Sequence, residues 1–131
     1  MTAGILHILP SGNSPEFFLN SEGIIKIKGR GLFGHNAEVL DSIMKWIDEY
    51  LNKPVETTYV YIALEYLNSL STTILVSILR KLSEGIILPD KLVIQWYYEE
   101  DDEDILERGE FISSTFNIPI KFLMTNNISE I

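Results

Sequence analysis

The chain contains no cysteine, so disulfides, thiolate catalysis and cysteine-based zinc sites are excluded. It also has no apolar run of the roughly 18 residues needed to span a bilayer. The apolar segment Ile5–Leu9 has no Lys or Arg before it, unlike a secretory signal. Cations are scarce, because 10 Lys and Arg stand against 19 Asp and Glu, a net charge of −9. Such a surface repels nucleic-acid and lipid phosphates. We therefore expect a cytoplasmic protein that binds neither nucleic acid nor membrane.

Recognisable arrangements of catalytic or metal-binding residues are also missing. His7 and His35 are the only histidines and are far apart in the sequence. The acidic run Glu99–Asp104 lacks the spacing of a calcium loop and is typical of a solvated helix start. No nucleophile elbow, Ser-x-x-Lys pair or kinase signature is present. We predict that the chain is not an enzyme, with no catalytic residue, no metal and no cofactor.

What the chain has is a regular alternation of apolar patterns, in a sequence that is 46% hydrophobic. Segments with two-residue periodicity alternate with segments of three- and four-residue periodicity, which predicts strands separated by helices and an α/β fold. We expect a single mixed β-sheet with about three helices packed on it, mainly on one face. The expected strands are Glu16–Asn20, Ile24–Lys28, Thr57–Leu67, Lys91–Tyr98 and Ile120–Met124, with Ile5–Leu9 as a short additional one. The expected helices run from Asn36 to about Leu51, from Ser69 or Ser71 to Gly85, and from about Asp102 to Thr115.

Residues 1–131 are expected to form one domain, with residues 1–15 and 125–131 loosely ordered. Thr57–Leu67 is largely apolar on both sides of its alternation, which predicts a central strand covered on both faces. The aromatic residues Trp46, Trp96, Tyr97 and Tyr98 favour core positions, although they can also form a binding surface.

The junction Leu64–Thr73 joins an apolar strand pattern to a helix pattern through Asn, Ser and Thr. Its hydroxyls lie where backbone N–H groups are unpaired and the helix dipole is positive, so a phosphate is well tolerated there. The same residues are also the preferred helix N-caps. The local pattern therefore fits either an ordinary cap or a phosphate-accepting site.

A glycine-rich segment, Gly29–Asn36, precedes the first expected helix. It fits flexible turn chemistry or, less well, a phosphate cradle, since it lacks the Lys-Ser/Thr ending of a P-loop. An alternative function that uses Gly29–Gly34 is a small-molecule or nucleotide sensor.

Several short blocks occur in an order and spacing that resemble the SiaC family of bacterial regulatory phosphoproteins, from about Ser14 to Leu123. These blocks are Ser14-Pro15, Gly29-Arg30, Lys45-Trp46-Ile47, Tyr66-Leu67-Asn68, Ile94-Gln95-Trp96-Tyr97-Tyr98 and Gly109-Glu110. The resemblance implies a STAS-like fold, similar to anti-sigma-factor antagonists, and a non-enzymatic partner switch. Two family features differ, because Gly31–His35 replaces the usual Ser-Tyr-Pro-Glu-Asn and Thr73 stands where a Lys is common.

The resemblance also implies the partners. A Ser/Thr kinase phosphorylates a hydroxyl just after the Tyr-Leu/Phe-Asn motif, a metal-dependent phosphatase removes the phosphate, and the unphosphorylated form binds and activates a diguanylate cyclase in cyclic-di-GMP signalling. By position the acceptor is Ser69, with Ser71 and Thr72 as the next candidates. We expect the partner to contact Tyr66, Asn68, Ser69, Leu70, Arg30 and His35.

Overall fold

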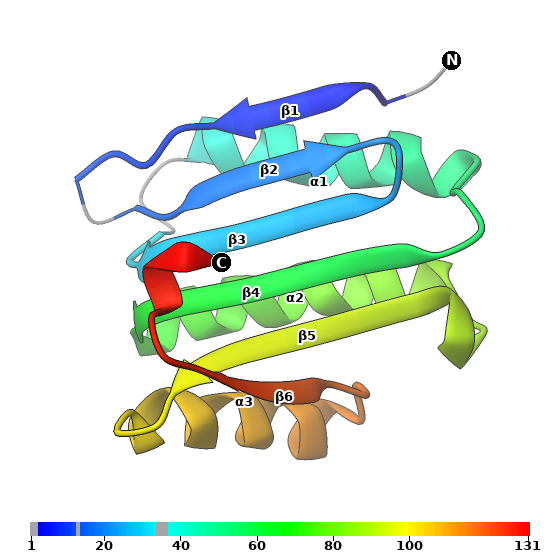
Figure 1. Ribbon diagram of the computed structural model, residues 1–131. Helices are drawn as coiled ribbons and strands as arrows, with labels where there is room; N and C mark the ends of the chain where they lie inside the picture. Colours follow the sequence, from blue (N-terminus) through cyan, green and yellow to red (C-terminus); the bar gives the residue numbers. More distant parts are fainter. Residues whose placement is uncertain (1–2, 13, 34–36) are drawn as a thin grey trace.

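The computed structural model describes residues 3–12, 14–33 and 37–131, which form one six-stranded sheet and three α-helices (Figure 1). The order of the strands in the sheet is their order in the chain. The first three strands pair antiparallel and the last three join in parallel, so the predicted mixed sheet is confirmed. The strands are β1 (Ile5–Ile8), β2 (Glu16–Asn20), β3 (Ile24–Gly31), β4 (Thr58–Leu67), β5 (Leu92–Glu99) and β6 (Lys121–Thr125).

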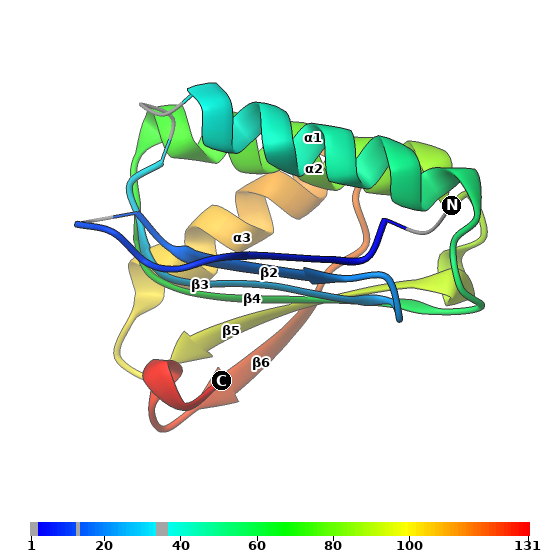
Figure 2. The ribbon, with the colours of Figure 1, turned by 90° about the horizontal axis from the view of Figure 1, so that it is seen from above.

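All three helices lie on the same face of the sheet (Figure 2). They are α1 (Ala37–Asn52), α2 (Ser69–Gly85) and α3 (Glu103–Phe116). Each follows the carboxyl end of a parallel strand, so the N-terminal ends of α2 and α3 lie at one edge of the sheet (Figure 1). This arrangement brings together residues that are far apart in the sequence.

The core lies between this helical layer and the sheet. The alternating inward residues of β3, β4 and β5 meet the apolar stripes of α1 and α2. Each fully buried Leu or Ile contributes about 1.5–3 kcal/mol to folding. Fully buried members include Ile25, Ile27, Ile62, Leu64, Ile43, Ile47, Leu75, Ile78 and Trp96.

Helix α3 packs directly on β5 through Trp96. The indole N–H of Trp96 donates to the carbonyl oxygen of Ile105 at 3.1 Å. A Cβ at Gly109 would lie 2.7 Å from the indole ring, so this position of α3 has room for glycine alone. The buried tryptophan therefore fixes the position of α3 relative to the sheet.

Within the described residues the second face of the sheet carries no α-helix, and only one end of it is covered, where the 3-10 helix Ile128–Glu130 contacts β4 and Ala63 is buried (Figure 1). The prediction that Thr57–Leu67 is covered on both faces therefore holds at Ala63 and is wrong at Tyr59, which is 39% exposed. Tyr59, Tyr61 and Tyr97 form a row of stacked rings on this face, and the ammonium of Lys26 lies 5.6 Å from the ring of Tyr61. A tyrosine packs its ring on a neighbour while its hydroxyl stays in water, so an apolar pattern rich in Tyr does not require burial.

The C-terminal tail, expected to be loosely ordered, forms the short 3-10 helix η2 (Ile128–Glu130). Ile128 is buried, and its backbone N–H donates to a carboxylate oxygen of Glu99 at 2.8 Å. The predicted N-cap of α1, Asn36, lies outside the described residues. Within the described part of the chain, no helix is both long and apolar enough to cross a membrane.

Candidate functional site

The junction between β4 and α2 has the geometry of a capped helix start. Asn68 has extended backbone angles and its side-chain oxygen accepts from the N–H of Ser71 at 2.9 Å. Ser69 is the first helical residue and is exposed. The N-cap is thus Asn68, which leaves the Ser69 hydroxyl free of the capping role.

The hydroxyl of Ser71 has a structural role. It is fully buried, donates to the carbonyl oxygen of Phe33 at 2.7 Å and accepts from the N–H of Phe33 at 2.9 Å. These two bonds attach the segment after β3 to the first turn of α2. Because its oxygen is enclosed and fully engaged, Ser71 is a poor acceptor for a phosphate.

The next two hydroxyls are also occupied. Thr72 donates to the carbonyl oxygen of Asn68 at 2.8 Å, and Thr73 donates to that of Ser69 at 3.2 Å. Among the described residues, the Ser69 hydroxyl makes no hydrogen bond. Of the four hydroxyls in this turn, Ser69 therefore combines exposure with an unengaged oxygen.

The ends of β3 and β4 and the first turn of α2 carry exposed side chains close to Ser69 in the fold. Arg30 is the register partner of Tyr66, and both are exposed. Tyr66 is 45% exposed and Leu70 is 49% exposed, although both are large and largely apolar. The structure therefore brings Arg30, Tyr66, Asn68, Ser69 and Leu70 to one edge of the sheet. The remaining residue expected here, His35, lies outside the described residues.

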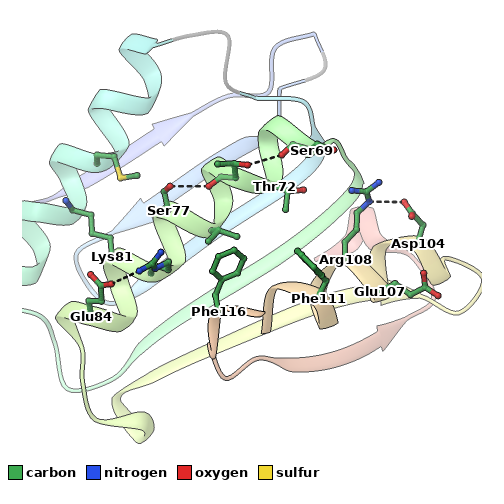
Figure 3. A pocket seen from close by; sticks show the side chains of 14 residues that line it. Ser69, Thr72, Ser77, Lys81, Glu84, Asp104, Glu107, Arg108, Phe111 and Phe116 are labelled. Carbon is green, nitrogen blue, oxygen red and sulfur yellow. Dashed lines mark hydrogen bonds and ion pairs between the residues drawn. The ribbon is translucent and has the colours of Figure 1, made fainter. Parts of the chain in front are cut away.

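A groove of about 960 Å³ runs from Ser69 along α2, with α3 on its other side (Figure 3). Its apolar surface includes Val76, Phe111 and Phe116, and Phe111 is 57% exposed. An apolar surface left open beside a helix is a common feature of sites that bind another protein. The lining residues are Met44, Ser69, Thr72, Thr73, Val76, Ser77, Arg80, Lys81, Glu84, Asp104, Glu107, Arg108, Phe111 and Phe116.

The charges in the groove are balanced, with three cations and three acids. Arg108 pairs with Asp104 at 3.1 Å, and Arg80 pairs with Glu84 at 3.6 Å, in each case one turn apart on the same helix. Lys81 pairs with Asp48 of α1 at 2.7 Å. The groove is thus close to neutral although the chain as a whole is strongly acidic.

Sequence reasoning found the Ser69 junction but missed the α3 side of this groove. Arg108, Phe111 and Phe116 were not among the expected partner-binding residues. One signal was present, because Phe111 and Phe116 fall outside the inward stripe formed by Ile105, Gly109 and Ile112.

The glycines described in the Gly29–Gly34 segment have backbone roles: Gly29 adopts a φ of +113° beside the register shift of β3, and Gly31 allows close strand packing. Gly29 and Gly31 belong to β3. A Cβ on Gly31 would lie 2.2 Å from the carbonyl oxygen of Tyr66, so glycine allows β3 and β4 to approach at the end of the sheet. Gly34 lies outside the described residues. Residues 3–12, 14–33 and 37–131 contain no group of three or more His, Asp or Glu side chains that can hold a metal ion.

The most perturbed titratable group of the described chain lies on the open face of the sheet, away from the groove. Burial raises the pKa of the Tyr97 phenol above 10.0, and the neighbouring Tyr61 raises it further. The Tyr97 hydroxyl donates to the side-chain oxygen of Gln95 at 3.1 Å. The raised pKa of Tyr97 therefore arises from packing on the sheet and is unrelated to the Ser69 site.

Comparison with known proteins gives one family and one fold. The model of SiaC family regulatory phosphoproteins matches residues 9–125. Apo-SiaC from Pseudomonas aeruginosa is 21% identical, with a TM-score of 0.76 over 91% of this chain and 98% of that chain. The structure of the diguanylate cyclase SiaD in complex with its activator SiaC, from the same organism, gives 20% identity and a TM-score of 0.78 over 92% and 99%. At these identities the solved structures show the likeness of the fold alone. No curated protein matches the chain.

Proposed function

Because the chain belongs to the SiaC family of regulatory phosphoproteins, we propose that it is a non-enzymatic partner switch in which phosphorylation of Ser69 prevents binding to a diguanylate cyclase. The observation that carries this proposal is the contrast among the four hydroxyls of the first turn of α2. Ser71, Thr72 and Thr73 donate to backbone carbonyl oxygens, whereas Ser69 is exposed and makes no such bond within the described chain. A kinase therefore reaches Ser69 without disturbing the fold.

The chemistry of the switch is simple. A Ser/Thr kinase transfers the γ-phosphoryl group of ATP to the Ser69 oxygen, so that the O–P bond forms, ADP leaves and the hydroxyl proton is released. A metal-dependent phosphatase restores the hydroxyl by hydrolysis, releasing inorganic phosphate. Phosphorylation adds about 1.5–2 negative charges and three strong acceptor oxygens to an exposed position. The N-terminal end of α2 tolerates this charge.

The groove between α2 and α3 is the place where we expect the cyclase to dock. Its apolar strip of Val76, Phe111 and Phe116 fits the apolar face of a partner helix, and its balanced charges suit a polar rim. Ser69, Tyr66 and Leu70 lie at one end of this surface. A hydrated dianion on Ser69 would have to be desolvated for the partner to bind, which lowers affinity by about a hundredfold or more. We name a diguanylate cyclase as the partner because SiaC from Pseudomonas aeruginosa, which has the same fold, forms a complex with the diguanylate cyclase SiaD as its activator.

Phosphosite mapping by mass spectrometry, on the protein isolated from its native cells, is the first test. We expect phosphate on Ser69 and none on Ser71. Absence of phosphate from all four hydroxyls across several growth states would contradict the switch.

The second test is binding of the purified diguanylate cyclase from the same cells. The chain carrying phosphoserine at position 69, installed during synthesis, should bind about a hundredfold more weakly than the unmodified chain. Phosphoserine at Ser114, an exposed position on α3 outside the lining of the groove, is the matched control and should leave the affinity unchanged. Equal affinities of the unmodified and Ser69-phosphorylated chains would overturn the proposal.

A further inference from the structure

At the Ser69 end of the groove, the α3 side carries a single cation, Arg108. The other two cations of the groove, Arg80 and Lys81, follow Ser69 by about three turns of α2, roughly 16 Å along the helix axis. The acids on the same side are Asp104 and Glu107. A phosphate on Ser69 would therefore face two carboxylates and one guanidinium from α3.

The guanidinium of Arg108 is held through one nitrogen. Its Nε donates to Asp104 at 3.1 Å, and within the described chain its two Nη nitrogens make no hydrogen bond. Figure 3 shows the guanidinium of Arg108 at the end of the groove where Ser69 lies, with only its Nε joined to Asp104. A guanidinium edge with two parallel N–H groups matches two oxygens of a phosphate.

We propose that Arg108 binds the phosphate on Ser69, and that Asp104 is a positioning residue that orients the guanidinium for this contact. The inference rests on the proposed function for the presence of the phosphate, but it concerns residues of α3 that the switch itself does not require. Arg108 is half-buried, with 35% of its side chain exposed, so its stem is already ordered while the Nη end stays accessible.

The contact has a consequence for regulation. When Arg108 binds the phosphate, its side chain joins α2 to α3 across the end of the groove. Phosphorylation then obstructs the partner twice, by the charge on Ser69 and by a side chain placed across the docking surface. Without Arg108 the phosphate would meet only the carboxylates of α3, and the modified form would be less stable.

The test is a ³¹P NMR titration of the full chain with phosphoserine installed at position 69 during synthesis. A cation in contact lowers the second pKa of the phosphate, so Arg108→Gln should raise this pKa by about half a unit or more. Arg80→Gln is the matched control, because Arg80 lies in the same groove and also pairs one turn along its helix. Arg30→Gln tests the other cation at this edge of the sheet, and Arg108→Lys should restore part of the effect. We expect Arg80→Gln and Arg30→Gln to leave the pKa unchanged.

The positioning role of Asp104 is tested by a double-mutant cycle in the same titration. In an Asp104→Ala background, Arg108→Gln should shift the phosphate pKa less than it does in the parent chain. An Asp104 that merely supported α3 would leave the size of the Arg108 effect unchanged, which would refute the positioning role. Equal phosphate pKa values in the parent and Arg108→Gln chains, or a larger shift from Arg30→Gln, would refute the role of Arg108. Neither the kinase nor the cyclase takes part in this titration, so its failure is separate from failure of the proposed function.

Discussion

Removing the Ser71 hydroxyl should destabilise the protein, whereas removing the Ser69 hydroxyl two residues away should not. In Ser71→Ala, both the N–H and the carbonyl oxygen of Phe33 lose their partner at a buried position. An unsatisfied buried polar group costs about 1–3 kcal/mol. Alanine recovers up to about 0.5 kcal/mol of helix propensity. With two such groups, the net loss is about 1.5–6 kcal/mol, or a fall in Tm on the order of 10 °C for a chain of this size.

Ser69→Ala removes an exposed hydroxyl with no partner in the described chain, so the free energy of unfolding should stay within about 0.5 kcal/mol of the parent value. Urea denaturation followed by circular dichroism measures both variants under identical conditions. The same two proteins, offered to the kinase, should show the opposite pattern, because Ser71→Ala is still phosphorylated and Ser69→Ala is not. Equal stabilities of Ser71→Ala and the parent would refute the structural role of Ser71.

Three further outcomes are expected. Phe111→Ala should weaken binding of the cyclase about tenfold without loss of stability, whereas Leu88→Ala, equally exposed but outside the groove, should leave the affinity measured by calorimetry unchanged. Gly109→Ala places a methyl group against the Trp96 ring and should lower the free energy of unfolding by about 1–3 kcal/mol, while Glu110→Ala beside it should be nearly neutral in denaturant melts. The raised pKa of Tyr97 means that the folded state holds this proton more tightly than the unfolded chain, so stability is lost as the pH rises above 10.0; Tyr97→Phe should reduce that loss in alkaline urea titrations.

The order of strands and helices was predictable because each element has a clear apolar period. The Ser69 junction was predictable because the helix start is encoded locally, by Asn68 and the hydroxyls after it. The role of Ser71 was not, since its partner Phe33 is 38 residues away and the sequence does not show which hydroxyl of a cluster turns inward.

Two other features were hidden for different reasons. Tyr59, Tyr61 and Tyr97 count as apolar residues in the sequence pattern and so predicted burial. Tyrosine is equally stable on a half-exposed face, where its ring packs on a neighbour and its hydroxyl stays in water. The groove depends on the packing of α3 against α2, and that packing is set by Trp96 and Gly109 rather than by any pattern around Ser69. Because the groove lies between two helices that are far apart in the sequence, the residue pattern of neither helix alone predicts it.

The position of Ser69 also predicts that phosphorylation changes binding and leaves folding intact. The dipole of α2 stabilises a phosphate at its first turn by about 0.3–1 kcal/mol, and the contact with Arg108 and the repulsion from the exposed Asp104 and Glu107 add terms of similar size and opposite sign. The net change in the free energy of unfolding should therefore stay within about 1 kcal/mol, or a Tm shift below about 4 °C. Differential scanning calorimetry of the chain with and without phosphoserine at position 69 measures this directly. A fall in Tm on the order of 10 °C would mean that the phosphate breaks the contact between α2 and the segment after β3, and the chain would then be controlled by unfolding of that contact rather than by an exposed charge.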